Sequence, residues 1–391
     1  MFAWICTLIV IASLVNYFRP LPVLGMSKNT PLSQIDDATS MPWPTDSTAA
    51  VGAAGYGVLA ASSESETPVP TASIAKIITA LSVLKQKPLN LNQQGPVLTL
   101  TQADVDSYNR YYAVDGSIVK VAVGEKISEY QALQAMLLPS ANNMADTLAT
   151  WAFGSLPSYS AYANQFVKQL HMARTTIGTD ASGLSPTTTS TPSDLILLGE
   201  VALQNPVIAQ IVSQTNATVP VAGTIPNVNR LLGKDGINGI KTGNSNEARG
   251  CILYSATYNL GVGKQITIIG AVMGAPTVAR AMTEVLPLLD AAKAQFSIDT
   301  VVHANQSYGD VYIPWLNSQA HAIAQYDTSA ITWQHTISPL TINLSSIKSS
   351  ASRDEQVGSI TTQSGDDNAI VPLVLDQSIP RPTFWWRLVR W

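Results

Sequence analysis

Three short polar motifs follow one another along the chain, and their residue types fit an acyl-transfer site. They are Ser73-Ile74-Ala75-Lys76, Ser140-Ala141-Asn142 and Lys241-Thr242-Gly243. A serine hydroxyl becomes a good nucleophile when a neighbouring base takes its proton, and here that base would be a lysine. The first two patterns also occur elsewhere, at Ser82–Lys85, Ser117–Lys120, Ser345–Lys348 and Ser107–Asn109, whereas Lys-Thr-Gly occurs once.

The setting of Ser73 separates it from the other Ser-x-x-Lys pairs. A polar loop, 67–71, precedes an apolar run at helical spacing: Ile74, Ile77, Ile78, Leu81 and Leu84. This predicts a helix with Thr71 as its N-cap, Ser73 in its first turn and Lys76 one turn later on the same face. The helix N-terminus would stabilise an oxyanion. Taken alone, the motif is more simply a helix start with a solvated lysine.

The second motif lies between two expected helices. Ser128 and Gln131 form a capping box, and the helix after them ends at Pro139. A new helix begins near Asn142, so Ser140 and Asn142 occupy a tight turn from which side chains can reach a cleft. A polar turn that only caps the second helix explains this motif equally well.

The third motif ends a short segment, 239–243, after a turn-rich stretch. Two β-rich runs follow, Cys251–Tyr258 and Gln265–Met273, and the segment 259–264 between them has the composition of a hairpin turn. We expect Lys241 on a strand, with Gly243 allowing a ligand backbone to approach. The alternative is a surface lysine at a strand edge.

With these motifs, the chain resembles the D-alanyl-D-alanine carboxypeptidases among the low-molecular-mass penicillin-binding proteins, which are serine peptidases of the Ser-x-x-Lys type. The resemblance spans roughly Ala49 to Phe296. It includes the segments 70–77, 137–145, 180–184, 190–195, 229–232 and 238–243. Three features depart from the family pattern: Ala141 replaces a glycine, Ser245 replaces a threonine, and the hairpin before the nucleophile is compressed to about 50–53 and 56–60.

The resemblance implies an α/β fold: a β-lactamase/transpeptidase-like domain, with an antiparallel sheet flanked by helices plus a helical lobe, followed by a small β-rich domain. It also implies catalytic roles. Ser73 would attack the carbonyl of the penultimate D-alanine. Lys76 would be the base, neutral because burial and the nearby Lys241 cation lower its pKa. Ser140 would relay a proton to the leaving amine, and Asn142 would orient Lys76 and the acyl side chain.

The remaining expected site residues bind substrate. By the same resemblance, Lys241 with the hydroxyls of Thr242 and Ser245 would hold the terminal carboxylate, beside Gly243. The backbone amides of Ser73 and Asn244 would form the oxyanion hole, in which one donor contributes about 2.7–4 kcal/mol.

The function expected from this resemblance is removal of the terminal D-alanine from peptidoglycan stem peptides, with β-lactams as inhibitors and no metal or organic cofactor. A D,D-endopeptidase or transpeptidase would use the same residues. A β-lactamase of class A needs a glutamate between the second and third motifs. Glutamate is absent between Glu129 and Glu200, and Glu200 itself sits inside the apolar helical run after Pro192, so we expect slow deacylation of penicillin. A catalytically idle cell-wall binding protein is the remaining alternative.

Composition excludes several other classes. A formal charge of −4 and 12% charged residues give no basic surface for nucleic acid. The two cysteines are Cys6 and Cys251, and no Cys/His spacing suggests zinc. The four histidines (His171, His303, His321 and His335) lie outside the motifs, which argues against a Ser-His-Asp triad.

The ends of the chain predict export and membrane attachment. Residues 1–25, apolar from Phe2 to Phe18, form either a cleaved signal, with a site ahead of Met26, or an uncleaved anchor; Arg19 and Lys28 follow the apolar run. Residues 26–47 are expected to be a linker, and 377–391 an amphipathic tail with Phe384, Trp385, Leu388 and Trp391 on one side. The tail could instead dock on its own domain. We therefore expect the enzyme on the outer face of a bacterial cytoplasmic membrane.

Between these ends the sequence predicts a catalytic domain, 48–297, and a β-rich domain, 298–376. A helix is expected over 278–296. The strands expected after it are 300–303, 310–314, 330–337, 340–344 and 369–375, and we expect their domain to act as a spacer.

Overall fold

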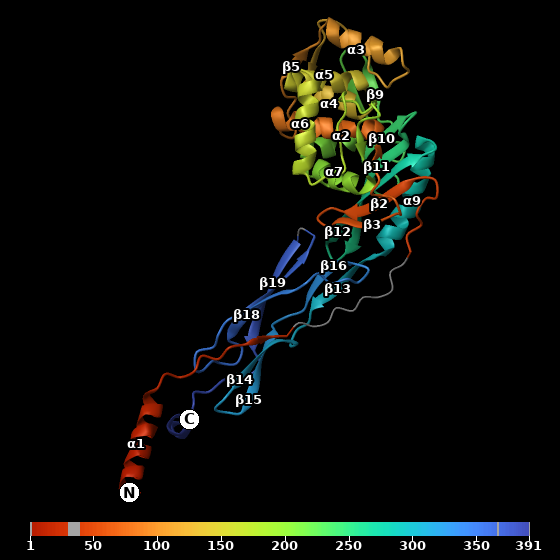
Figure 1. Cartoon of the computed structure of the whole chain (residues 1–391). Coiled ribbons are helices and arrows are strands. Elements are labelled where there is room, and N and C mark those ends of the chain that lie inside the picture. The colour runs from red at the N-terminus through yellow and green to blue at the C-terminus, as the bar shows by residue number, and fades with distance from the viewer. Residues whose placement is uncertain (1, 30–39, 366, 391) are drawn as a thin grey trace. The chain divides into compact units, whose positions relative to one another are not determined.

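The computed structural model describes residues 2–29, 40–365 and 367–390. The chain divides into two compact units, one formed by 39–295 and the other by 1–38 together with 296–391 (Figure 1). The first unit carries all three motifs. The second joins the N-terminal segment to the β-rich part of the chain.

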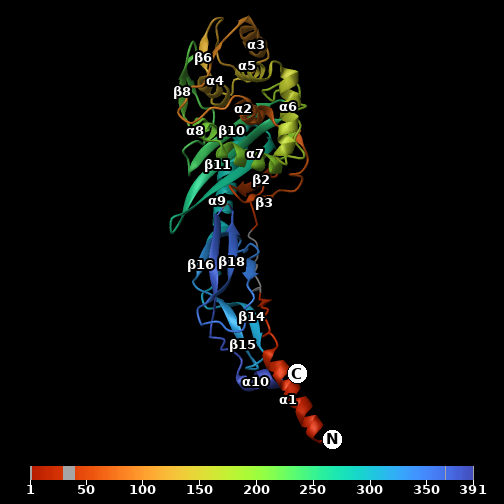
Figure 2. The same cartoon turned by 90° about the vertical axis from the view of Figure 1, so that its left-hand side faces the viewer.

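A five-stranded antiparallel sheet forms the centre of the first unit, in the order β10-β11-β12-β2-β3. Its long hairpin, β11 (Arg249–Gly261) and β12 (Lys264–Ala275), confirms the predicted one. The other strands are β10 (Ile237–Ser245), β2 (Thr48–Ala53) and β3 (Gly57–Ala61). Helices α7 (Pro192–Gln204) and α9 (Val278–Ala294) pack on this sheet (Figure 2). The expected antiparallel sheet flanked by helices is confirmed.

A helical lobe accompanies the sheet. It contains α3 (Gln102–Tyr112), α4 (Glu129–Leu137), α5 (Asn142–Phe153) and α6 (Leu156–Gln169). Helix α2 (Ala75–Gln86) contacts α4, α5, α6 and α7, and every residue from Ala75 to Leu84 is buried. A helix buried on all sides belongs to the core, so α2 joins the lobe to the rest of the unit.

Smaller elements complete the first unit. They are α8 (Pro206–Val212) and the strand pairs β4 (Val69–Pro70) with β7 (Thr189–Ser190), β5 (Val97–Thr99) with β6 (Lys126–Ser128), and β8 (Asn216–Val219) with β9 (Gly223–Pro226).

The helix boundaries around the motifs largely follow the sequence signals. The Ser128 side chain accepts from the backbone N–H of Gln131, so the predicted capping box is confirmed, and α4 ends before Pro139. The nucleophile helix begins differently. A 3-10 turn, η1 (Ala72–Ile74), precedes α2, and the side chain of Thr71 makes no capping hydrogen bond. Instead, the Thr71 hydroxyl donates to the carbonyl of Ala72.

The second unit contains a six-stranded sheet in the order β1-β14-β15-β19-β18-β17, and a separate pair, β13 with β16. The bounds of the long strands are β13 (Phe296–Val302), β14 (Ser307–Ile313), β15 (Ser318–Ala324), β16 (Thr328–Trp333), β17 (Thr341–Leu344), β18 (Gln356–Ser364) and β19 (Asp367–Leu375). The sequence predicted five of these strands and missed β15 and β18, which are rich in Gln, Ser, Thr and Ala. The predicted helix end at Phe296 was wrong, because Phe296 opens β13.

Both ends of the chain belong to the second unit. Helix α1 (Phe2–Phe18) precedes β1 (Ser27–Lys28), which pairs antiparallel with β14. The predicted linker therefore does not begin at residue 26; its residues 30–39 lie outside the described part. Helix α10 (Phe384–Val389) forms the tail, of which Trp391 is not described. No single helix among the described residues has both the length and the hydropathy of a membrane span; the sharply bent pair α7 and α8 passes that test by length and composition alone.

Candidate active site

Ser73 and Lys76 lie together at the junction of η1 and α2. Lys76 Nζ is 2.7 Å from Ser73 Oγ. Ser73 is partly exposed, whereas Lys76 is fully buried within the core helix. Ala72, directly before the nucleophile, has a φ of 46°, a left-handed conformation that is unfavourable for a residue with a side chain. The strained turn leaves the hydroxyl facing the cavity and the amine beneath it.

The surroundings of Lys76 favour its neutral form. Burial is the main cause that lowers its pKa well below the ordinary value, and the positive charge of Lys241 is the second. Nζ donates to Asn142 Oδ1 at 2.7 Å and to the carbonyl of Ser182 at 3.0 Å. A neutral amine has two N–H groups and one lone pair. Since both N–H groups have carbonyl acceptors, the lone pair is left for the proton of Ser73.

The loop that supplies the Ser182 carbonyl is ordered by Asp180. The Asp180 carboxylate accepts from the backbone N–H groups of Ser182, Leu184 and Ser185 at 2.9–3.2 Å. Gly183, which follows Ser182, has a φ of 76°, and a Cβ there would lie 2.1 Å from the carbonyl oxygen of Ala72. The loop therefore packs directly against the nucleophile turn.

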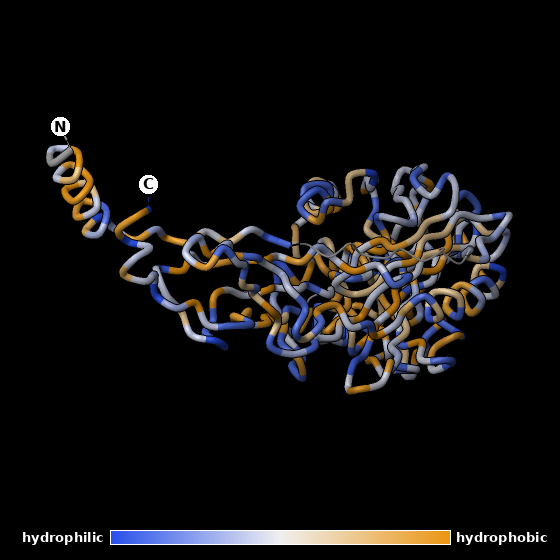
Figure 3. Tube along the Cα trace, turned by 90° about the horizontal axis from the view of Figure 1, so that it is seen from below, coloured by the Kyte–Doolittle hydropathy of each residue, from blue (hydrophilic) through white to orange (hydrophobic). Residues whose placement is uncertain are grey.

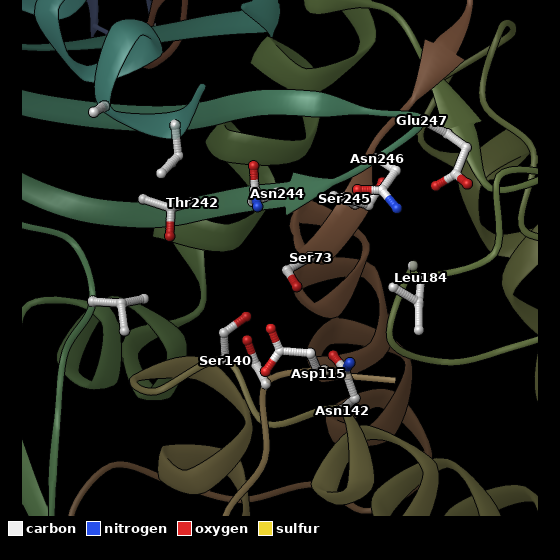
Figure 4. Close-up of a pocket in the computed structure, with 18 of the residues that line it drawn as sticks. Ser73, Asp115, Ser140, Asn142, Leu184, Thr242, Asn244, Ser245, Asn246 and Glu247 are labelled. Atoms are coloured by element: carbon white, nitrogen blue, oxygen red, sulfur yellow. The ribbon is translucent and has the colours of Figure 1, made fainter. Parts of the chain in front are cut away.

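Ser140 faces the same cavity from the turn between α4 and α5 (Figure 4). Its φ is 69°, and its buried Oγ has no hydrogen-bond partner among the described residues. A buried hydroxyl without a partner is costly, and a substrate or water in the cavity would provide one. The backbone N–H of Asn142 donates to the carbonyl of Ser117 at 2.8 Å, which ties the turn to a neighbouring loop.

Strand β10 forms the opposite wall. It is an edge strand, and Thr242, Gly243, Asn244 and Ser245 line the cavity. A Cβ at Gly243 would lie 2.9 Å from the Thr71 carbonyl oxygen and 3.3 Å from the Ser73 nitrogen. The nucleophile turn of the protein itself thus approaches Gly243 closely, and the ligand approach expected there stays a prediction. An exposed strand edge can also pair with an extended peptide.

Lys241 lies behind this wall. It is 2% exposed, does not line the cavity, and its Nζ donates to the carbonyl of Thr242 at 3.0 Å. Burial lowers its pKa to about 7. Ser245 Oγ accepts from the backbone N–H of Ala248 at 3.0 Å, which leaves its O–H free to donate into the cavity. Thr242 and Ser245 therefore line the cavity, whereas Lys241 is buried behind them, and the expected carboxylate contact of these three residues stays a prediction.

The cavity has a volume of about 970 Å³ and includes residues that sequence reasoning missed. Asp115, Arg230, Asn246 and Glu247 contribute polar groups, and Val278, Ala279 and Met282 form an apolar side. Charged turn residues are common in any sequence, so no signal distinguished Asp115 and Glu247 from other surface carboxylates. Glu200, which the sequence placed inside a helix and not in a catalytic loop, accepts from the backbone N–H of Gly55 at 2.7 Å and does not line the cavity.

The described residues give no sign of a metal site or of a reactive cysteine. None of the described residues form a group of three or more His, Cys, Asp or Glu side chains that could hold a metal ion. Cys251 is fully buried on β11, where burial raises the pKa of its thiol to about 11, as fits a small core hydrophobe.

Comparison with known proteins identifies the family of this chain. The model of the D-alanyl-D-alanine carboxypeptidase family, peptidase S11, matches residues 44–277. The chain is 30% identical over 243 residues to a D-alanyl-D-alanine carboxypeptidase of Streptomyces sp. strain K15, covering 57% of this chain and 79% of that protein. It is 29% identical over 204 residues to a D-alanyl-D-alanine endopeptidase of Pseudomonas aeruginosa, covering 49% and 60%.

A solved structure shows the same fold. The Streptomyces K15 DD-transpeptidase superposes with a TM-score of 0.58 at 24% identity, over 66% of this chain and 100% of that one. The family match covers more than half of the chain and includes all three motifs. The protein therefore belongs to the peptidase S11 family of D-alanyl-D-alanine carboxypeptidases.

Proposed function

We propose that the protein is a serine D,D-carboxypeptidase that removes the terminal D-alanine from peptidoglycan stem peptides through an acyl-enzyme on Ser73. The observation that carries this proposal is the hydrogen bonding of Lys76, whose two carbonyl acceptors leave its lone pair for the Ser73 hydroxyl. The other support is the family, whose name describes this reaction.

Acylation would proceed as follows. The Ser73 hydroxyl gives its proton to Lys76 Nζ while Oγ bonds to the carbonyl carbon of the penultimate D-alanine. The backbone N–H groups of Ser73 and Asn244 stabilise the resulting oxyanion. The C–N bond then breaks, and the proton passes from Lys76 through Ser140 Oγ to the amine of the departing D-alanine. The Oγ of Ser140, for which the described part of the chain offers no hydrogen-bond partner, suits that relay.

Deacylation would use the same base. A water molecule attacks the ester carbonyl, Lys76 takes its proton, and the bond to Ser73 Oγ breaks as the serine regains a proton. The terminal carboxylate of the substrate would lie along β10, held by Thr242 and Ser245 hydroxyls, with the positive charge of Lys241 behind them. A β-lactam would acylate Ser73 in the same way and leave slowly.

The same residues could pass the acyl group to an amine, or cut a cross-linked peptide. The match to a protein named an endopeptidase keeps that second activity as an alternative. A β-lactamase and an idle wall-binding protein are further alternatives, and each has a distinct result below. In every case the substrate lies outside the cytoplasm, so we place the catalytic unit on the outer side of the membrane.

The test is release of D-alanine from an acylated Lys-D-Ala-D-Ala tripeptide by the full chain and by Ser73→Ala. Release by the parent alone supports the proposal. Penicillin acylation of Ser73 without D-alanine release would contradict carboxypeptidase action and favour the endopeptidase, to be checked with a cross-linked dimer. Rapid turnover of penicillin would identify a β-lactamase. Neither activity, with a folded protein by circular dichroism, would leave the wall-binding alternative.

A further inference from the structure

The segment that follows α1 is part of the β-rich unit. Leu24 is only 4% exposed and belongs to its hydrophobic core. Its backbone N–H donates to the carbonyl of Ile347 at 2.8 Å, and the N–H of Ile347 donates back to Leu24 at 3.0 Å. Ser27 and Lys28 then pair with β14. Cleavage ahead of Met26 would remove a core side chain and a reciprocal pair of backbone hydrogen bonds.

The C-terminal helix closes onto the end of α1. Arg390 donates from Nε and Nη2 to the carbonyl of Asn16 at 3.1 and 2.8 Å, and Arg387 Nη2 donates to the carbonyl of Tyr17 at 2.6 Å. The last four carbonyls of a helix lack intrahelical donors, and residue 20, the normal partner of the Asn16 carbonyl, is a proline without an N–H. Two guanidinium groups thus satisfy the negative end of the helix dipole.

Aromatic contacts support this closure. The Arg387 guanidinium lies 4.2 Å from the centre of the Tyr17 ring, and the ring of Phe384 lies 5.3 Å from it. Trp315 of the β-rich domain contacts both α10 and the segment before it. The Trp315 Nε1–H donates to the Pro380 carbonyl at 2.8 Å, and its ring is 5.7 Å from that of Trp386. The tail is therefore fixed to the β-rich domain and to α1 at once.

What these helices leave exposed is apolar. Along α1, which carries no charged residue, nine large hydrophobic side chains face outward: Trp4, Ile5, Leu8, Ile9, Val10, Ile11, Leu14, Val15 and Phe18. The trace of this helix is mostly hydrophobic in Figure 3. Phe384, Trp385 and Val389 of α10 are also exposed. The 17 residues of α1 span about 26 Å at 1.5 Å per residue.

We propose that residues 1–25 stay in the mature protein and that α1 and α10 form one composite anchor for a lipid bilayer. Helix α1 enters the hydrocarbon region. Helix α10 lies at the polar boundary, where tryptophan and arginine side chains are favoured. Its arginines fasten the end of α1 to the β-rich domain, so the tail acts as a clasp and not as an independent anchor. This proposal concerns attachment and does not depend on the reaction at Ser73.

The first experiment is the mass and N-terminal sequence of the full chain recovered from the membrane fraction of a producing bacterium. We expect a protein that keeps residues 1–25 and resists carbonate extraction. A mature N-terminus at Met26 would overturn the proposal.

Leu24→Ala should lower the thermal midpoint of the β-rich unit by about 10 °C, whereas an unchanged midpoint would show that Leu24 is dispensable.

The second experiment separates the two helices. Purified protein is floated with vesicles of phosphatidylethanolamine and phosphatidylglycerol. Leu8→Asp with Ile11→Asp, both at exposed positions of α1, should abolish flotation. Leu91→Asp, the same change of side chain at an exposed leucine of the other unit, is the control and should not. Full flotation of the α1 variant would mean that α10 anchors by itself and would refute the composite anchor.

The third experiment tests the clasp. Arg387→Ala with Arg390→Ala should leave vesicle binding in place but make the tail at least tenfold more sensitive to limited proteolysis. Arg381→Ala removes a nearby exposed arginine for which no contact with α1 is found in the described part of the chain, and it serves as the control. Equal protection of the tail in the double variant and the control would refute the clasp.

Discussion

The substitution Asn142→Asp tests the idea that Lys76 works as a neutral base. Asn142 Oδ1 lies 2.7 Å from Lys76 Nζ, and an aspartate has nearly the same shape. The change keeps an acceptor oxygen in place and adds a negative charge beside the amine. A negative charge favours the protonated form of Lys76 and so raises its pKa toward the ordinary range.

The size of this effect follows from the distance. Two unit charges 2.7 Å apart attract by about 6 kcal/mol at an effective dielectric constant of 20. Part of this is offset because burial of the new carboxylate raises the pKa of that carboxylate. If about half remains, the pKa of Lys76 rises by about two units, at 1.36 kcal/mol per unit. Below its pKa the amine is protonated and cannot accept the Ser73 proton, so the neutral fraction at a given acidic pH falls about 100-fold.

The assay is the second-order rate of Ser73 acylation by a fluorescent penicillin, measured between pH 5 and 10. We expect the rising limb of the Asn142→Asp profile to move to higher pH by about two units. Asn142→Ala is the control. It loses one acceptor of Lys76 without adding charge, so its rate should fall about tenfold at every pH while the limb stays in place. A profile for Asn142→Asp with the parent limb would refute a neutral Lys76 as the base.

Four further substitutions have distinct expected results. Burial lowers the pKa of Lys241 from 10.5 to about 7, so kcat/KM of the parent enzyme should fall above pH 7 as this residue loses its charge. Lys241→Arg keeps its charge and should abolish this fall. If kcat/KM of the variant still falls above pH 7, another group causes the decrease. Because the pKa of Lys241 is lower in the folded than in the unfolded protein, its charge destabilises the fold by about 5 kcal/mol below pH 7, and this cost disappears as the pH rises to 10.5. Lys241→Met should therefore raise the free energy of unfolding in denaturant more at pH 6 than at pH 10. Equal gains at the two pH values would contradict this. Asp180→Asn weakens the acceptor of three backbone N–H groups. It should slow acylation about tenfold and leave the thermal midpoint nearly unchanged. An acylation rate like that of the parent would show that other contacts hold the Ser182 carbonyl. Gly243→Ala brings a methyl within 2.9 Å of the Thr71 carbonyl oxygen and should lower the acylation rate at least tenfold, while Gly25→Ala, with open space at its Cβ, should not; equal rates would refute the tight packing.

Much of the catalytic unit follows from local sequence. Hairpin β11–β12 was predicted from two β-rich runs and the turn residues between them, and helix α4 from the Ser128 capping box, because those signals act between neighbours in the chain. The β-rich unit was harder. Strands β15 and β18 carry few β-branched apolar residues in alternation, and their pairing with distant strands decides their structure.

The motifs gave the residue types, and the family resemblance gave their expected partners, including a neutral Lys76 beside Ser73. The sequence alone also determined the family, since the three motifs and their flanking segments are local strings. Only the tertiary structure decided how the groups meet. The Ser182 carbonyl is more than a hundred residues from Lys76 in the chain, and Asn142 is 66 residues away.

Tertiary packing likewise added a contact to one local interpretation and corrected another. The glycine at 243 receives the protein's own nucleophile turn, and the segment after α1 is a strand of the β-rich unit with Leu24 in its core. Both depend on contacts between segments far apart in the sequence. The local sequence decides which residue types can take part in the site. Burial by segments far apart in the chain decides which of these residues are neutral, which have a strained backbone and which contact one another.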